Sequence, residues 1–313
     1  MDDKNDPEKQ PKASAYDNAV YQHLATKLEE AKPSWQTDGM GIAGPPEHGE
    51  IESKPIVIDS VNAYLTAAKN LYGSGYFGST QIFRGQSKTR DIWPLLPKAG
   101  RNGFFDIKSY QCDTPKWERL DRYGYSSPAD MRAFSDWRNK AIAYRELPDD
   151  EWECLALAQH YGLATRLLDW TRNPLVALFF AACDNPEVHG AVYAYPGPSL
   201  VTTHNFEGIK DIMLYEPKPF DRRILAQKGV LTFHSNPLLP LRPATSYWTI
   251  NAKVNKYGTD LIEFLVPAFS KNDILGDLAV LGISRSSLFP DLEGLSWELN
   301  NCHKQYFTIH FPT

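Results

Sequence analysis

Cysteine is scarce in this sequence, with only 4 among 313 residues. Cys112, Cys154, Cys183 and Cys302 lie far apart and form no CxxC pair, which argues against a structural zinc site. So few cysteines are typical of a reducing compartment, and the opening MDDKNDPEKQPK lacks the basic and apolar regions of a secretory signal. We therefore expect a cytoplasmic protein that contains no metal and is stabilised by a hydrophobic core.

Long apolar runs and the common catalytic motifs are also missing. The longest apolar run, LVALFFAAC at residues 175–183, is about half of the roughly 18 residues that a membrane span needs, so we expect a buried helix and no membrane contact. The absence of P-loop, GxGxxG, HExxH and EF-hand spacings disfavours nucleotide motors, dehydrogenases and zinc proteases. Ser286 and Ser287 have no GxSxG context, and no acidic cluster suggests a metal-dependent nuclease.

The sequence has no excess of positive charge. Its 33 basic and 38 acidic residues give a net charge of -5, which does not favour binding to duplex nucleic acid, although a local basic groove stays open. Residues 1–50 contain 10 acidic and 5 basic residues and thus carry all of this net charge. We predict an acidic N-terminal leader at residues 1–50, partly helical over Ser14–Ala31 or disordered, followed by one domain at residues 51–313.

The body of the sequence alternates between helix and strand patterns. Hydrophobic residues make up 42% and aromatic residues 12%, which suits a globular core better than a coiled coil or solenoid. Asn173-Pro174 is a good helix start, and Gly162 is a good helix end. The class is therefore α+β, with strands predicted near 81–83, 165–170, 190–195, 229–234 and 261–266, and helices near 56–68, 116–144, 151–161, 175–183, 272–283 and 292–299.

Four segments together resemble the FRG domain, a bacterial and phage family named for its Phe-Arg-Gly motif. They are IFRGQ at 82–86, AQHYGLATRLLDWTRNPLVALFFAA at 158–182, RRILAQKGVLTFH at 222–234 and LGISRSSLFPDLEGL at 281–295. The resemblance covers about residues 55–300 and identifies the body as an FRG domain. It does not by itself imply a reaction, because the family is defined by a sequence pattern rather than by an activity.

The order of these motifs is also similar to the arginine class of the ADP-ribosyltransferase fold, a split β-sandwich. That class has an aromatic-Arg-Gly strand, then a Ser-Thr-Ser strand before a VAxxFA helix, then a catalytic glutamate. The counterparts are Phe83-Arg84-Gly85, then Asp169-Trp170-Thr171 with residues 175–182, and then Gln227. Gln227 departs from the pattern, because an amide can hold a ribose hydroxyl but cannot act as a base. The resemblance implies a single domain with a mixed, split β-sheet core flanked by helices.

Several residues in these motifs are candidates for an anion site. Arg84 follows an apolar strand and precedes Gly85, so its guanidinium can reach a phosphate, or else pair with a core acid such as Asp169. Thr171 and the first amides of the next helix predict a further pyrophosphate contact. Asp169 shares a strand face with Thr171, and it either contacts the substrate or is a buried structural acid.

Three more candidates have an equally plausible structural role. His160 either satisfies carbonyls at its helix end or acts as an acid, base or ribose donor. Tyr161 either packs or stacks on a base or nicotinamide. Gln227 either is an exposed turn residue before a strand or approaches a ligand closely.

Together these residues predict one site for a nucleotide. The predicted catalytic residues are Arg84, His160, Asp169 and Gln227, and the predicted cofactor-binding residues are Arg84, Gly85, Tyr161, Thr171 and Gln227. The resemblance implies an ADP-ribosyltransferase-like effector that uses NAD, such as a toxin or phage-defence component, with Asp169 supplying the missing carboxylate. The alternative is a non-catalytic module that binds a nucleotide or a partner, and the acceptor stays open. We expect the four catalytic candidates to lie within about 10 to 12 Å of one another.

Overall fold

The computed structural model describes residues 55–71, 81–101, 104–105, 128–195, 199–203, 206, 209, 212–243, 258–259 and 261–300. The predicted acidic leader at residues 1–50 and its proposed helix lie outside these residues, as do the glycine-rich stretch 73–78, the first part of the predicted helix 116–144, and Cys112 and Cys302. The predicted boundary at residue 50 therefore stays a prediction.

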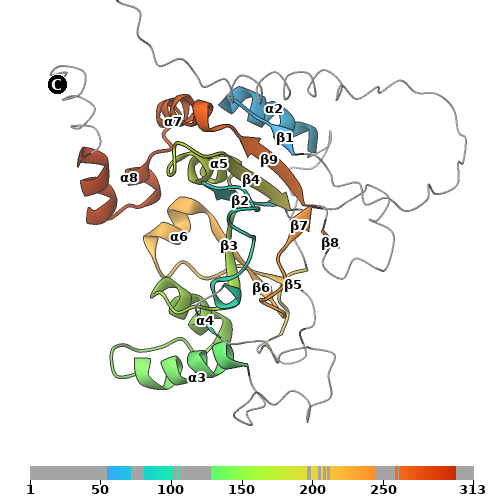
Figure 1. The fold of residues 1–313 in the computed structure, drawn as a ribbon. Helices are drawn as coiled ribbons and strands as arrows, with labels where there is room; N and C mark the ends of the chain where they lie inside the picture. Colours follow the sequence, from blue (N-terminus) through green and yellow to red (C-terminus); the bar gives the residue numbers. More distant parts are fainter. Residues whose placement is uncertain are drawn as a thin grey trace, which may run out of the picture. The chain divides into compact units, whose positions relative to one another are not determined.

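A seven-stranded mixed sheet forms the centre of the fold (Figure 1), in the order β1-β9-β4-β2-β3-β6-β5. β1 and β9 run parallel, and the other neighbouring strands are antiparallel. The α+β class with a mixed sheet is thus confirmed. The strands are β1 (Ile56–Val57), β2 (Ile82–Gln86), β3 (Leu167–Thr171), β4 (Gly190–Tyr195), β5 (Ile212–Tyr215), β6 (Gly229–His234) and β9 (Ile262–Val266), and β7 (Arg242–Pro243) pairs separately with β8 (Gly258–Thr259).

Two groups of helices cover one face of this sheet. The first group is α2 (Val61–Leu71), α5 (Pro174–Ala182), α7 (Lys271–Val280) and α8 (Arg285–Leu288), whose buried side chains share a core with those of β2, β4 and β9. The second is α3 (Ala129–Ala141) and α4 (Glu151–His160), which pack on β3 and β6 through a separate core. Short helices η2 (Lys98–Gly100), η5 (Ala268–Ser270) and α6 (Arg222–Gln227) and a helical segment at 292–300 complete the described elements.

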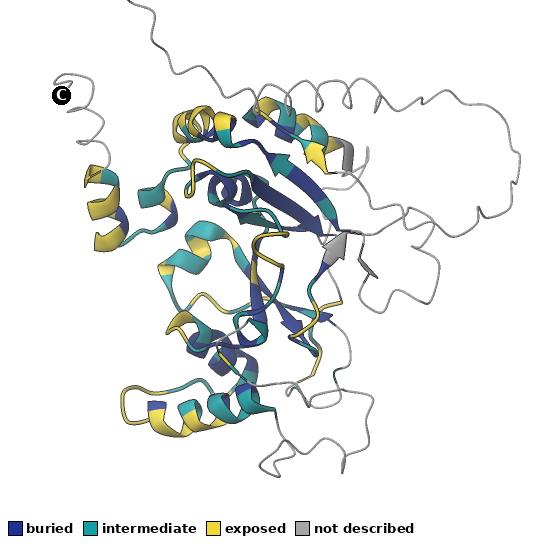
Figure 2. Cartoon of the chain, viewed as in Figure 1, coloured by how far each residue is buried: buried dark blue, intermediate teal, exposed yellow. Residues whose placement is uncertain are grey.

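The strand register explains why both helix groups lie on the same face. Phe83 is paired with Thr171, and Leu167 with Phe233, so side chains of the two cores project to one side of the pleated sheet. The opposite face holds a third core that includes Trp170 and Tyr193. Figure 2 shows the strands as the most buried part of the molecule, whereas α3 and α7 carry many exposed residues.

Gly85 permits a close approach between β2 and α5. A Cβ atom added at Gly85 would lie 1.8 Å from the carbonyl oxygen of Ala177, and one at Gly190 would lie 2.2 Å from that of Ala181. No side chain fits at either position without moving the helix backbone. Strand alternation then sends the side chain of Arg84, the neighbour of Gly85, away from α5.

Several local predictions are confirmed because their signals were local. β4 and β6 have the predicted bounds, and α5 begins with the Asn173 side chain accepting a hydrogen bond from the Leu175 amide. After α4, Gly162 has a φ of 94°, the left-handed conformation expected of a terminating glycine. Three expectations were wrong. Ile56 and Val57, placed at the start of a predicted helix, form strand β1, and α2 begins only at Val61. Arg84 lies within β2 rather than after it, and Gln227 ends α6, a helix that was not predicted.

Candidate functional site

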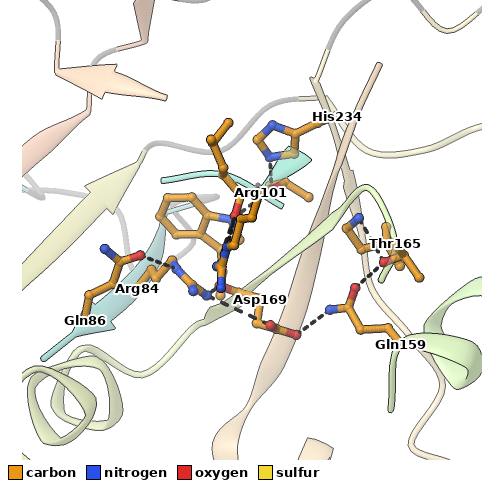
Figure 3. A network of polar contacts seen from close by, with 11 residues as sticks. Arg84, Gln86, Arg101, Gln159, Thr165, Asp169 and His234 are labelled. Atoms are coloured by element: carbon orange, nitrogen blue, oxygen red, sulfur yellow. Dashed lines mark hydrogen bonds and ion pairs between the residues drawn. The ribbon is translucent and has the colours of Figure 1, made fainter. Parts of the chain in front are cut away.

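β2 and β3 are neighbours in the sheet, but their pairing is much shorter than that of the adjacent strands. Five residue pairs join β2 to β4 and five join β3 to β6, whereas Phe83 and Thr171 form the one registered pair between β2 and β3. Beyond that pair, the Arg84 side chain crosses from β2 and its Nη1 donates a hydrogen bond of 2.6 Å to the main-chain oxygen of Asp169. We call this region the β2–β3 split, and its lining residues are Arg84, Arg101, Gln159 and Asp169 (Figure 3).

The side chain of Asp169 is exposed to solvent at the β2–β3 split. Its side chain is 70% exposed, although the other residues of β3 are buried and β3 has a neighbouring strand on each side. One carboxylate oxygen, Oδ2, lies 4.0 Å from Arg84 Nη1. The other, Oδ1, accepts a 2.7 Å hydrogen bond from Gln159 Nε2 on α4. The alternative that Asp169 is a buried structural acid is therefore wrong.

The buried acid next to β3 is Asp130 instead. Arg166 donates hydrogen bonds of 2.7 and 2.8 Å to its two carboxylate oxygens, and also bonds the main-chain oxygen of Ser235 at 3.0 Å. The side chains of Arg166 and Asp130 are 4% and 1% exposed, so this pair is closed to ligands and belongs to the core.

Arg84 and Arg101 give the split an excess of positive charge. Burial lowers the pKa of Arg84, Asp169 raises it, and the neighbouring Arg101 lowers it further. Burial likewise lowers the pKa of Arg101, which Asp169 raises. Because two guanidinium groups share the field of a single carboxylate, a further anion would be favoured between them.

Arg84 and Arg101 are held in place by hydrogen bonds that use only some of their N–H donors. Arg84 Nε donates to Gln86 Oε1 at 3.2 Å, and Arg101 Nε and Nη2 donate to the Leu96 oxygen at 3.2 and 3.1 Å. The Arg101 guanidinium also lies over the Trp93 ring, 5.3 Å from its centre. Within the described part of the chain, no group accepts a hydrogen bond from Arg84 Nη2 or Arg101 Nη1. These free donors are suited to a bidentate anion.

His160 and Tyr161 make their contacts outside this network. His160 Nε2 lies 3.5 Å from Asp221 Oδ2, the residue that caps α6, and its ring packs edge-on against Phe220. Tyr161 is 61% exposed and accepts a 3.3 Å hydrogen bond from Arg145 Nη1. Both residues follow Gln159 directly, so they lie at the end of the helix that supplies a lining residue.

Thr171 and Gln227 contact each other rather than Arg84. Thr171 Oγ1 donates to the main-chain oxygen of Gln227 at 2.6 Å and accepts from the Asn173 amide at 2.9 Å. The side-chain amide of Gln227 donates to the Leu288 oxygen at 3.0 Å. Of the predicted catalytic residues, Arg84 and Asp169 are therefore the two in direct contact. Amides of Asn173 and Leu175 at the start of α5 already have partners, and Gly85 faces α5.

Gln159 and Arg101 were not identified from the sequence. Gln159 precedes His160 in the AQHYG motif, and its helical position gives no indication that it reaches a strand residue. Arg101 follows a 3-10 helix that is anchored where the Ala99 amide donates to the Thr165 oxygen at 3.0 Å. Neither contact has a sequence signal of its own, although the distinctive motif around Gln159 pointed to the right segment.

A buried histidine lies behind the split. Thr232 Oγ1 accepts from Trp170 Nε1 at 2.9 Å and lies 3.0 Å from His234 Nε2. Either atom can be the donor in this contact, because a hydroxyl can accept two hydrogen bonds as well as donate one. The other ring nitrogen, Nδ1, is buried and has no hydrogen-bond partner among the described residues. Burial, with the added charges of Arg84 and Arg166, lowers the pKa of His234 to about 3.

Comparison with known proteins gives a family match and no relative. The family model described as the FRG domain matches residues 79–189, a range that contains Arg84, Arg101, Gln159 and Asp169. No curated protein and no solved structure matches the chain. Among the described residues, no cluster of His, Cys, Asp or Glu is suited to hold a metal ion, and none of the helices combines the length and apolar character required to cross a bilayer.

Proposed function

We propose that this chain, which contains an FRG domain over residues 79–189, binds an NAD-type dinucleotide in the β2–β3 split and transfers its ADP-ribosyl group. One observation carries the proposal: Arg84 and Arg101 share a single carboxylate, Asp169, which is 70% exposed in the middle of the sheet. This combination supplies cations for a diphosphate next to an accessible carboxylate. A toxin or phage-defence component would use such an activity as an effector.

The diphosphate suits the two arginines. A guanidinium forms a planar fork that matches phosphate oxygens, and charge-assisted hydrogen bonds are stronger than neutral ones. The Arg84 side chain is only 15% exposed, so its interaction with a bound phosphate is weakly screened by water. We therefore assign the pyrophosphate to Arg84 Nη2 and Arg101 Nη1, and Tyr161 is the candidate for stacking.

Asp169 is the carboxylate of the proposed reaction. The bond between ribose C1 and the nicotinamide nitrogen breaks, and its electron pair leaves with nicotinamide. A nearby carboxylate stabilises the positive charge that develops on the ribosyl ring. The acceptor then forms the new bond to C1, and its proton passes to the Asp169 carboxylate.

One feature supports the ADP-ribosyltransferase analogy, and one argues against it. The separation of β2 and β3 is consistent with a split sheet that has the aromatic-Arg-Gly strand on one side. Gln227, the counterpart of the catalytic glutamate, is an amide bonded to Leu288. This second feature favours the alternative proposal, a module that binds a nucleotide or a partner without catalysis.

Release of nicotinamide from NAD separates the two proposals. We expect the purified full-length protein, incubated with NAD and candidate acceptors, to release nicotinamide that mass spectrometry detects. Asp169→Asn removes the charge but keeps the shape, and it should slow release by about 100-fold. Asp136→Asn makes the same change at an exposed position on α3 and should leave the rate unchanged. NAD binding without release would support the binding module. Neither binding nor release would overturn the dinucleotide site and leave a module that binds a partner as the remaining alternative.

A further inference from the structure

We infer that Gln159 is a positioning residue that fixes the Asp169 carboxylate for the reaction at the β2–β3 split. The inference rests on the proposed function for its catalytic consequence, but the positioning itself is a property of the free protein. Gln159 lies on α4, and its side-chain Nε2 donates a 2.7 Å hydrogen bond to Asp169 Oδ1.

A chain of hydrogen bonds determines which end of the Gln159 amide faces Asp169. The Leu167 amide donates to Thr165 Oγ1 at 3.2 Å, and that hydroxyl in turn donates to Gln159 Oε1. Because the Asp169 carboxylate can only accept, the NH₂ group of Gln159 faces Asp169, and its oxygen is left to accept from the Thr165 hydroxyl. Thr165, two residues before β3, is thus linked through Gln159 to a carboxylate in the middle of that strand.

The two ends of this chain of hydrogen bonds differ in burial: Thr165 is buried, and Asp169 is exposed. Thr165 is 2% exposed, so its hydroxyl has few alternative partners, whereas the Asp169 side chain is 70% exposed. An exposed aspartate without a partner would sample several rotamers. Gln159 holds Oδ1 and leaves Oδ2 available on the side of Arg84. A fixed orientation of this kind lowers the cost of reaching the reactive geometry.

Gln159 contacts the Asp169 carboxylate without adding a charge next to it. The charged groups that face Asp169 are Arg84 and Arg101, and the chain of hydrogen bonds adds no charge of its own. A glutamate at position 159 would place a second carboxylate against Asp169 Oδ1. Two carboxylates in contact cannot both ionise readily, so they share a proton over part of the pH range.

The first test needs no nucleotide. We would follow the aspartate and glutamate carboxyl carbons of the full-length protein by ¹³C NMR while the pH is varied. In Gln159→Glu, we expect the titration midpoint of the new carboxyl pair to lie at least about one pH unit above that of wild-type Asp169. Glu151→Gln, at the other end of α4, is the matched control and should leave the Asp169 signal unchanged. An Asp169 titration identical in Gln159→Glu and wild type would overturn the inference.

The second test uses NAD turnover. Gln159→Ala should lower kcat by about tenfold to 100-fold while KM changes little, because the arginines that hold the diphosphate are untouched. Thr165→Val should also lower kcat, whereas Thr165→Ser, which keeps the hydroxyl, should retain the wild-type kcat. An unchanged kcat in Gln159→Ala would contradict positioning. If the wild-type protein neither binds nor cleaves NAD, the proposed function fails, and the titration alone decides whether Gln159 positions Asp169.

Discussion

Two arginine–aspartate pairs, one just before the start of β3 and one in its middle, use the same residue types in opposite ways. Arg166 and Asp130 are 4% and 1% exposed and are joined by two short hydrogen bonds. Arg84 and Asp169 are 15% and 70% exposed, their charged atoms are 4.0 Å apart, and the arginine bonds the backbone instead of the carboxylate. The first pair is complete without a ligand, whereas the second leaves one donor and one carboxylate oxygen without a hydrogen-bond partner among the described residues.

The difference shows what distinguishes a structural ion pair from a binding site. A buried pair is tolerable only when its hydrogen bonds are satisfied, and Arg166 meets that condition with Asp130 and Ser235. In the split, the Arg84 side chain is 15% exposed while its carboxylate partner stays in water, and Arg101 adds further positive charge. A bound anion would offset this excess of positive charge, and we therefore place the ligand at the β2–β3 split.

Breaking the closed pair should have the largest effect on stability. Asp130→Ala leaves the Arg166 charge buried without its partner, so we expect the free energy of unfolding to fall by about 3 to 5 kcal/mol. Chemical denaturation at neutral pH measures this loss. A loss below about 1 kcal/mol, as for a surface pair, would show that the two pairs do not differ as we describe.

The stability of the protein should depend on pH through His234, whose pKa is lowered by burial and by the charges of Arg84 and Arg166. His234 has a pKa of about 3 in the folded protein, lowered chiefly by burial, against 6.5 as its ordinary value. The unfolded chain therefore binds a proton between these pH values that the folded chain does not, and stability falls as the pH drops below about 6.5. The loss from pH 7 to pH 5 should be about 2 kcal/mol.

Denaturation curves of wild type and His234→Gln at the two pH values isolate this contribution. The variant cannot take up the proton, so its stability should change less between pH 7 and pH 5 than that of wild type. Equal changes in both proteins would mean that His234 is protonated as easily in the folded chain as in the unfolded chain, which would contradict its burial among positive charges.

The exposed pair should contribute least to stability. Asp169→Asn removes a charge that is mostly in water, and exposed ion pairs typically contribute about 0 to 1 kcal/mol. We expect a change in unfolding free energy within that range, far below the effect of Asp130→Ala. Thermal or chemical unfolding of both variants side by side makes the comparison direct, and a large loss for Asp169→Asn would assign Asp169 to the core structure.

Much of the local structure was predictable because its causes are local. The Asn173-Pro174 start of α5, the Gly162 end of α4 and the apolar patterns of β4 and β6 are read from neighbouring residues. α6 and β5 are six and four residues long, which is too short for a periodic pattern to stand out. The sequence also suggested the contact of Arg84 with Asp169, as one of two alternatives.

The resemblance implied a split sheet, but its position between β2 and β3 could not be predicted, because it depends on how segments far apart in the chain pair with each other. Phe83 and Thr171 meet at one registered pair, and nothing in either segment indicates that the strands part beyond it. Arg101 and Gln159 line the site through tertiary contacts alone. The resemblance to the transferase pattern led to Arg84 and Asp169, which line the site, but also to Gln227 and Thr171, which are joined to each other by a hydrogen bond before β6.

Titration of NAD into the full-length protein and its Arg84→Ala variant tests the central claim most directly. We expect isothermal titration calorimetry to show affinity weakened by at least about tenfold, or about 1.4 kcal/mol, because the variant loses a charged fork to the diphosphate. Lys140→Ala, which removes one exposed positive charge at the end of α3, should bind NAD as wild type does. Equal affinity of wild type and Arg84→Ala, or no binding by either, would contradict a dinucleotide site in the β2–β3 split.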